Sequence, residues 1–95
     1  MGTSRLIYRM HALRRMFERD IRAGDVERVV RSGEVIEDYR DDHPYPSRLL
    51  LGFVESRPLH VVAAENRVND ETIIVMVYEP DRSYWDDAFR QRKRP

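Results

Sequence analysis

The sequence has no cysteine, no apolar run as long as a membrane span, and no apolar segment of signal-peptide type after Met1. The first absence excludes a disulfide framework, and the other two argue against a transmembrane helix and a secretory leader. A glycine-rich phosphate loop and a clustered carboxylate pair are also missing, as are repeats and low-complexity segments. We therefore expect a soluble cytoplasmic protein that meets no membrane and holds no cofactor.

The length of 95 residues fits one domain, residues 1–95, with a thin hydrophobic core. A chain this short removes roughly two-thirds or less of its unfolded surface from water, so a partner often adds stability. The basic end of the chain, residues 90–95, is expected to be mobile.

The net charge of zero hides an uneven distribution along the chain. Residues 1–31 hold eight Arg and four acids, residues 32–87 hold five Arg and thirteen acids, and residues 88–95 hold three Arg, one Lys and no acid. Sixteen of the seventeen cations are Arg, whose planar guanidinium suits phosphate binding and base stacking. A basic face built from the two ends would hold a polyanion such as RNA, while the acidic middle meets a basic partner or stays solvated.

Apolar residues near the start of the chain recur at spacings of four, three and four, at Leu6, Met10, Leu13 and Phe17. This period predicts an amphipathic helix from Ser4 to about Asp20 that buries this stripe, with Ala12 and Met16 widening the buried arc. The opposite side of the helix carries His11, Arg15, Glu18 and Arg22, with Tyr8 and Arg19 flanking them. A charged helix face of this kind is often only a solvated surface.

Gly24 and Asp25 break the first helical pattern, and Asp25 is the predicted N-cap of a second helix that ends near Gly33. Residues 35–39 then form a possible first strand with a polar face. Residues 40–47 contain two prolines and are expected to form a loop. Within this loop, Asp41, Asp42 and His43 have no second pair of ligands at a recognisable spacing, so no metal site is expected.

Residues 59–64 and 72–78 are rich in β-branched and aromatic side chains and flank a polar connection, which predicts a β-hairpin. A symmetric hairpin places His60 opposite Met76, with Tyr78 diagonal to His60 on the same face. His60 is then either a solvent-facing functional group or a cap on the edge of a half-buried sheet. Residues 49–55 form the strand before this hairpin.

The predicted fold is α+β, with two N-terminal helices packed on one face of a four-stranded antiparallel sheet and a short C-terminal helix or turn around Trp85 and Phe89. Both faces of the strands are apolar, and two short helices cover only one of them. The face left uncovered would carry Leu50, Val54, Ile74 and Met76. We expect a homodimer or another partner to cover it.

A set of short motifs resembles one bacterial family. The matching motifs are His11-Ala12, Arg15-Met16, Arg19, Ile21, Val26, residues 33–37, Tyr45-Pro46-Ser47, Leu51-Gly52, residues 58–62, residues 77–80 and Trp85. Over about residues 8–90 they resemble the domain-of-unknown-function family 4258. Met76 departs from the family, which often has Thr there, and Asp20 replaces a common Gly. The resemblance implies a small protein encoded beside an antitoxin and similar to RelE-like ribonuclease toxins.

Two functions follow as hypotheses. The first is a toxin of a type II toxin–antitoxin system that cleaves RNA without a metal, by acid–base chemistry on the ribose 2′-OH. The second is a non-catalytic, dimeric interaction module with a basic rim. The resemblance favours the first, whose partners are RNA and a cognate antitoxin.

The first hypothesis assigns roles to nine residues. The catalytic candidates are His11, His60, Arg15 and Tyr78. The candidates for RNA binding are Arg19, Arg22, Trp85, Arg90 and Arg92. If the first helix packs along the sheet edge, His11 and His60 are expected to flank one basic groove as acid and base.

Overall fold

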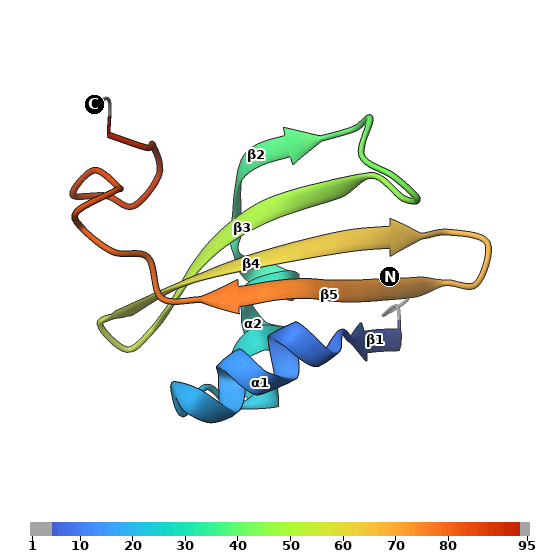
Figure 1. Cartoon of the computed structure of the whole chain (residues 1–95), viewed down its shortest axis with the longest axis horizontal. Coiled ribbons are helices and arrows are strands. Elements are labelled where there is room, and N and C mark those ends of the chain that lie inside the picture. Colours follow the sequence, from blue (N-terminus) through green and yellow to red (C-terminus); the bar gives the residue numbers. More distant parts are fainter. Residues whose placement is uncertain (1–4, 94–95) are drawn as a thin grey trace.

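The computed structural model describes residues 5–93, which form five strands and two helices. The elements follow one another as β1 (Arg5–Tyr8), α1 (Met10–Glu18), α2 (Ala23–Ser32), β2 (Glu34–Tyr39), β3 (Ser47–Val54), β4 (Arg57–Asn66) and β5 (Glu71–Tyr78) (Figure 1). Neither helix within residues 5–93 is long and apolar enough to cross a membrane.

The five strands form one mixed sheet in the order β1-β5-β4-β3-β2. β1 pairs in parallel with β5, and the other neighbouring strands are antiparallel. The α+β class and the two helices agree with the prediction, but the four-stranded antiparallel sheet is wrong. A strand that precedes both helices can pair in parallel with the last strand, because the long intervening chain supplies the crossover that a parallel pair requires.

The first helix begins later than predicted, because residues 5–8 belong to the sheet. Leu6 and Tyr8 are half-buried while Arg5 and Ile7 are exposed, which is the period-two pattern of a strand. Ser4, where the helix was expected to begin, lies outside the described residues. The N–H of Arg9 donates to the carbonyl oxygen of Ile74 at 3.0 Å, and α1 starts at the next residue.

The predicted main stripe of this helix is also wrong, although two residues expected in the buried arc are buried. Ala12 and Met16 are buried, whereas Met10, Leu13 and Phe17 are exposed. α1 lies along β5, where the small side chain of Ala12 allows the helix to approach the sheet closely. Because β1 fixes how the chain enters α1, the helix turns Ala12 and Met16 towards the sheet. Its other apolar side chains point away from the sheet.

The second helix begins two residues earlier than Asp25. The Asp25 carboxylate accepts a hydrogen bond from the backbone N–H of Arg22 at 3.1 Å, so Arg22 is the N-cap and Asp25 stands in the first turn. The helix ends at Ser32, just before Gly33, as predicted. Val26 and Val29 are its buried residues, and they pack against the same sheet face as α1.

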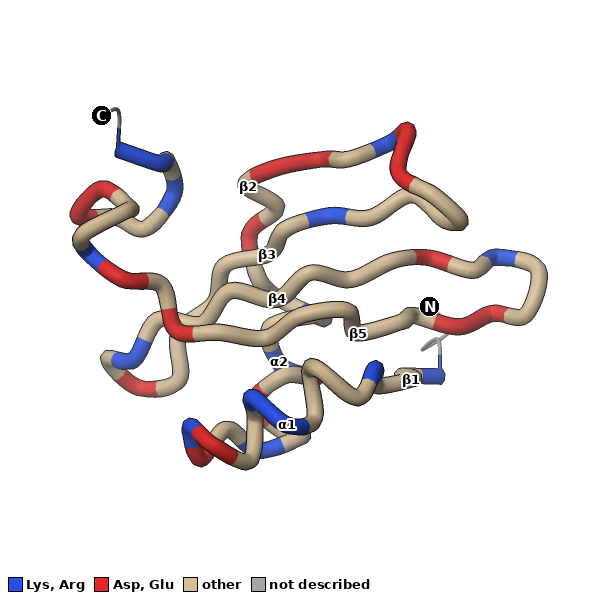
Figure 2. Tube along the Cα trace, viewed as in Figure 1, with Lys and Arg blue, Asp and Glu red and all other residues tan. Residues whose placement is uncertain are grey.

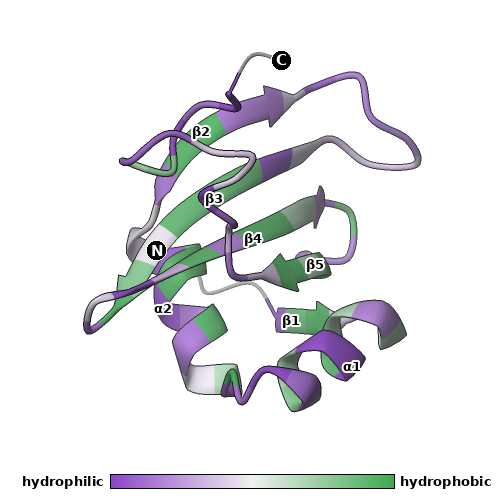
Figure 3. Cartoon of the chain, turned by 60° about the vertical axis from the view of Figure 1, so that its left-hand side comes forward, coloured by the Kyte–Doolittle hydropathy of each residue, from purple (hydrophilic) through white to green (hydrophobic). Residues whose placement is uncertain are grey.

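The larger core lies between the helices and one face of the sheet, where β3, β4 and β5 each contribute buried side chains. Its buried members are Ala12, Met16, Ile21, Val26, Val29, Leu50, Leu59, Val61, Ala63, Ile74 and Val77. The helices lie together on one side of the sheet (Figures 1 and 3). Leu50 and Ile74, which were expected on the uncovered face, are therefore buried under the helices, and Val54 is half-buried there.

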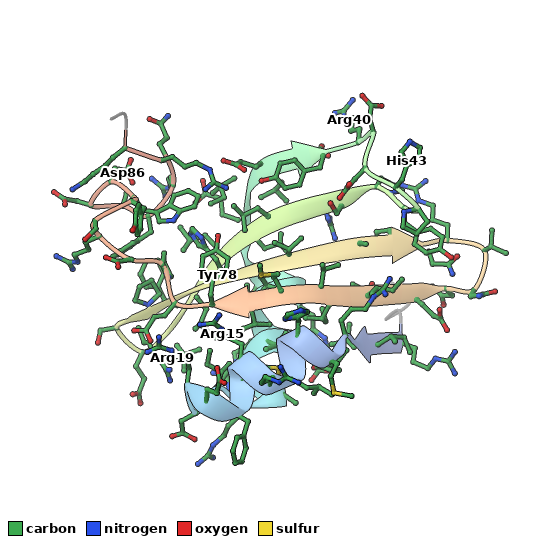
Figure 4. All side chains as sticks on the ribbon, in the orientation of Figure 1. Arg15, Arg19, Arg40, His43, Tyr78 and Asp86 are labelled. Carbon is green, nitrogen blue, oxygen red and sulfur yellow. The ribbon has the colours of Figure 1, made fainter. Side chains whose placement is uncertain are left out.

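Part of the second sheet face is covered by the chain's own C-terminal segment, residues 81–93. Trp85 and Phe89 of this segment pack on Leu49 and Leu51. The segment is a series of turns, held in part by the Asp86 carboxylate, which accepts from the backbone N–H of Arg90 at 2.9 Å (Figure 4). Of the residues expected to be left uncovered, Met76 alone is exposed on this face, at 49 %.

Gly52 marks a close approach of β3 to α2. A Cβ atom at Gly52 would lie 2.6 Å from a methyl carbon of Val29. We predict that Gly52→Ala lowers the free energy of unfolding by about 1–3 kcal/mol, because the extra methyl forces the helix away from the sheet. Chemical denaturation measures this.

Gly24→Ala is the matched control for that substitution. No atom outside the neighbouring backbone lies within 4 Å of a Cβ atom there, and Gly24 is exposed in α2. This change should raise the free energy of unfolding by up to about 1 kcal/mol, since alanine favours helix. Equal effects of the two substitutions would contradict the packing of α2 on β3.

Candidate functional site

His60 lies at the centre of the second sheet face and is fully buried. Its Nε2 is 2.8 Å from the carbonyl oxygen of Phe89, and its Nδ1 is 3.1 Å from the hydroxyl of Tyr78. Because a carbonyl only accepts, Nε2 carries the proton and Nδ1 accepts from the Tyr78 hydroxyl. The imidazole thus joins β5 to the C-terminal segment.

Aromatic rings enclose this imidazole. The Trp85 ring meets it edge-on, with ring centroids 4.4 Å apart, and the Tyr78 ring does the same at 5.1 Å. Burial lowers the pKa of His60 from its usual value, although the hydrogen bond to the Phe89 carbonyl acts in the opposite direction. His60 is therefore neutral at neutral pH.

Charged and phenolic groups lie beside the buried histidine. The Arg92 guanidinium is 4.7 Å from the centre of the Trp85 ring and 3.6 Å from the Glu37 carboxylate. The Tyr39 hydroxyl donates to the same carboxylate. We call His60, Tyr78, Trp85, Arg92, Glu37 and Tyr39 the Tyr78 cluster.

The Tyr78 cluster has a buried floor and a solvent-accessible rim. Burial raises the pKa of Tyr78, while the nearby Arg92 charge opposes that rise. Tyr78 is only half-buried, and 60 % of the Arg92 side chain is exposed. A guanidinium in this position can hold a phosphate, and a phenol hydrogen-bonded to a neutral imidazole can pass a proton to it.

The structure brings four of the nine predicted site residues together in this cluster, namely His60, Tyr78, Trp85 and Arg92. Two expectations about His60 are nevertheless wrong: it is buried rather than solvent-facing, and it pairs with Tyr78 across the strands instead of with Met76. Met76 pairs with Val62, and a bulge follows between Val62 and Ala63. The bulge accounts for one residue of this two-residue shift, and the turn accounts for the other, since Ala64 pairs with Ile73 and not with Thr72.

The other predicted residues lie outside the cluster. His11, Arg15 and Arg19 are exposed on α1, and Arg22 is exposed just before α2. The helices pack on one sheet face and His60 lies on the other, so His11 and His60 do not flank a common groove. Figure 4 shows Arg15 and Arg19 on α1 and Tyr78 at the end of β5.

The basic C-terminal residues are held close to the sheet. Arg90 forms an ion pair with Glu34 of β2 at 2.9 Å, and the backbone N–H of Lys93 donates to the Tyr84 carbonyl oxygen at 2.8 Å. Arg94 and Pro95, at the end of the predicted mobile tail, lie outside the described residues. The acids of β2 thus face the last arginines of the chain (Figure 2).

Glu37 and Tyr39 are the cluster members that the sequence did not single out. They stand two residues apart in β2 and therefore point to the same face of the strand. This alternation of side chains along β2 was the feature of the sequence that could have identified them. It could not be used alone, because β2 meets the cluster through its pairing with β3, through Arg92 and through packing near Trp85, all of which are contacts with distant parts of the chain.

A hollow at the other end of the strands is a weaker candidate. It has a volume of about 720 Å³ and is lined by Asp38, Arg40, Pro46, Ser47, Arg48, Glu65 and Arg67. Four of its five charged side chains already pair, with Arg40 at 3.3 Å from Asp38 and Arg48 at 3.5 Å from Glu65. In the part of the chain that the structure describes, no three His, Asp or Glu side chains gather as metal ligands.

One comparison with known proteins gave a match. The model of the family described as "Domain of unknown function (DUF4258)" matches residues 8–79. Neither the curated proteins nor the solved structures gave a match to the chain.

The buried His60 predicts a pH dependence of stability. The pKa of His60 is lowered in the folded state. Below about pH 6.5 this side chain is therefore protonated in the unfolded chain while it stays neutral in the folded chain. The contribution of His60 to the free energy of unfolding is fully present above that pH, and it is lost as the pH falls towards the pKa of the folded state. We predict that His60→Gln removes this part of the pH profile in denaturant titrations between about pH 7.5 and 5.

His11→Gln is the control for this measurement, since His11 is exposed on α1. It should keep the wild-type profile. A difference between wild type and His60→Gln that does not vary with pH in this window would contradict the buried, neutral imidazole.

Proposed function

The chain belongs to the DUF4258 family, and we propose that it is a metal-independent endoribonuclease that acts at the Tyr78 cluster, as the toxin of a type II toxin–antitoxin system. One observation carries the proposal of an activity: the Tyr78 hydroxyl donates to the neutral His60 at a rim that also holds the exposed guanidinium of Arg92. The toxin role rests on what the family resemblance implies, namely a similarity of this family to RelE-like ribonuclease toxins.

The arrangement suits removal of a proton from a ribose 2′-OH. The Tyr78 oxygen accepts that proton while its own proton passes to Nδ1 of His60, where the hydrogen bond from Nε2 to the Phe89 carbonyl stabilises the imidazolium. The 2′-oxygen bonds to phosphorus, and the bond from phosphorus to the 5′-oxygen breaks. The 5′-oxygen takes a proton from water, and the hydroxide that remains takes a proton from the Tyr78 hydroxyl, which regains its own from Nδ1 of His60. His60 acts through Tyr78 and does not touch the substrate.

Arg92 would stabilise the charge that develops on the phosphate. Its guanidinium can bind two phosphate oxygens at once, and the neighbouring Glu37 and Trp85 hold it in place between turnovers. The same positive charge favours the transient negative charge on the Tyr78 oxygen. Trp85 is buried under this site, so it supports the cluster from below and does not stack a base.

We predict that Tyr78→Phe lowers the rate of RNA cleavage by about 10²–10⁴-fold, because it removes the proton-transferring oxygen and keeps the ring. Tyr84→Phe is the matched control, since Tyr84 is 68 % exposed and lies outside the cluster. Cleavage of a labelled RNA at equal concentrations of folded protein measures both. Cleavage by Tyr78→Phe at the wild-type rate, or no cleavage by the wild type, would overturn the proposal.

The toxin role has a separate test in cells. Induction of this chain alone should arrest growth, and co-expression of the neighbouring open reading frame should relieve the arrest. Tyr78→Phe should grow normally in both conditions. If wild type and Tyr78→Phe arrest growth equally, the toxicity does not come from this site.

A further inference from the structure

The outward side of α1 carries an apolar stripe that the fold does not use. Met10 is 70 % exposed, Leu13 45 % and Phe17 90 %. They stand at positions i, i+3 and i+7 of one helix and therefore share one face. Ala12 and Met16 already provide the contact of α1 with the sheet, so the stripe contributes nothing to this core.

Two arginines without carboxylate partners flank this stripe, and two more lie on the opposite side of the helix. At 100° per residue, Arg9 and Arg14 fall on its two sides, and Arg15 and Arg19 lie further round the helix. Within residues 5–93, none of these four arginines forms an ion pair. Eight other arginines do, namely Arg5, Arg28, Arg31, Arg40, Arg48, Arg57, Arg90 and Arg92.

We propose that this surface, Met10, Leu13 and Phe17 with Arg9 and Arg14, is a docking site for an acidic amphipathic helix of a partner protein. The i, i+3, i+7 spacing is the pattern with which one helix packs against another. Guanidinium groups on both sides of the stripe would pair with carboxylates on both sides of an apolar stripe in the partner. Charge complementarity thus specifies the chemistry of the occupant.

The charges argue against other occupants. A second copy docked through the same helix would place arginine against arginine, which is repulsive. RNA would pair with the arginines and leave Met10 and Leu13 without a complementary surface.

The docking site is tested by selection from a displayed library of random peptides of about 15 residues, roughly four helical turns, with the full-length chain as target. We expect the selected peptides to be acidic, with apolar residues at helical spacing. Phe17→Ser should weaken their binding at least about tenfold, as expected for the removal of a central aromatic anchor. Arg14→Glu should abolish binding, because it replaces an attraction with a repulsion.

Two substitutions control for exposure and charge. Val68→Ser removes another apolar side chain that is 93 % exposed, and Arg67→Glu reverses another exposed arginine, both in the turn between β4 and β5. Neither should change peptide binding. Recovery of no peptide, selection of peptides that are not acidic, or equal losses from Phe17→Ser and Val68→Ser would each overturn the proposal.

The alternative occupants have their own measurements. Binding to vesicles of anionic phospholipid that is lost in Phe17→Ser would assign the surface to a membrane. A concentration-dependent dimer that is lost in the same variant would assign it to a second copy. Either result would overturn the proposal, whereas RNA cleavage should be the same for Phe17→Ser and wild type, so the docking site and the catalytic site are tested independently.

Discussion

The hydrogen bond between His60 and the Phe89 carbonyl oxygen is the contact on which the second half of the structure depends. It fastens the C-terminal segment over an apolar sheet face that would otherwise be open to water. With the segment in place, Trp85 and Phe89 complete a second core with Leu49 and Leu51, and Arg92 comes within reach of Glu37. A chain of 95 residues thereby covers one face of its sheet with helices and part of the other with its C-terminal segment.

The same contact gives the site its chemistry. Because the carbonyl accepts from Nε2, the imidazole is fixed as one tautomer, and its other nitrogen must accept from Tyr78. His60, which was expected from the sequence to face solvent, is therefore a buried residue that orients the Tyr78 hydroxyl. The proposed catalysis and the observed packing share one set of hydrogen bonds, so a change at His60 affects both.

The local sequence pattern predicted the existence of the β4–β5 hairpin and of α2, because in each segment the periodicity of apolar residues and the turn residues favour the same structure. It failed at residues 5–8, where Leu6 fits a helical stripe with Met10 as well as it fits a strand with Tyr8. Pairing with β5, more than sixty residues away, decides that choice, and such a contact leaves no local signal. The buried face of α1 was mispredicted for the same reason, because it depends on how β1 pairs with β5. The partner of His60 was mispredicted because of the bulge and the turn register within the β4–β5 hairpin.

The buried, neutral state of His60 is tested most directly by its imidazole nitrogen-15 chemical shifts in nitrogen–proton correlation spectra recorded as a function of pH. The account predicts a protonated Nε2 and an unprotonated Nδ1 at neutral pH, with no protonation of Nδ1 as the pH falls through about 6.5. Two nitrogens with averaged shifts that titrate together near that pH would show an exposed imidazole, free of both Tyr78 and Phe89, and would contradict the account.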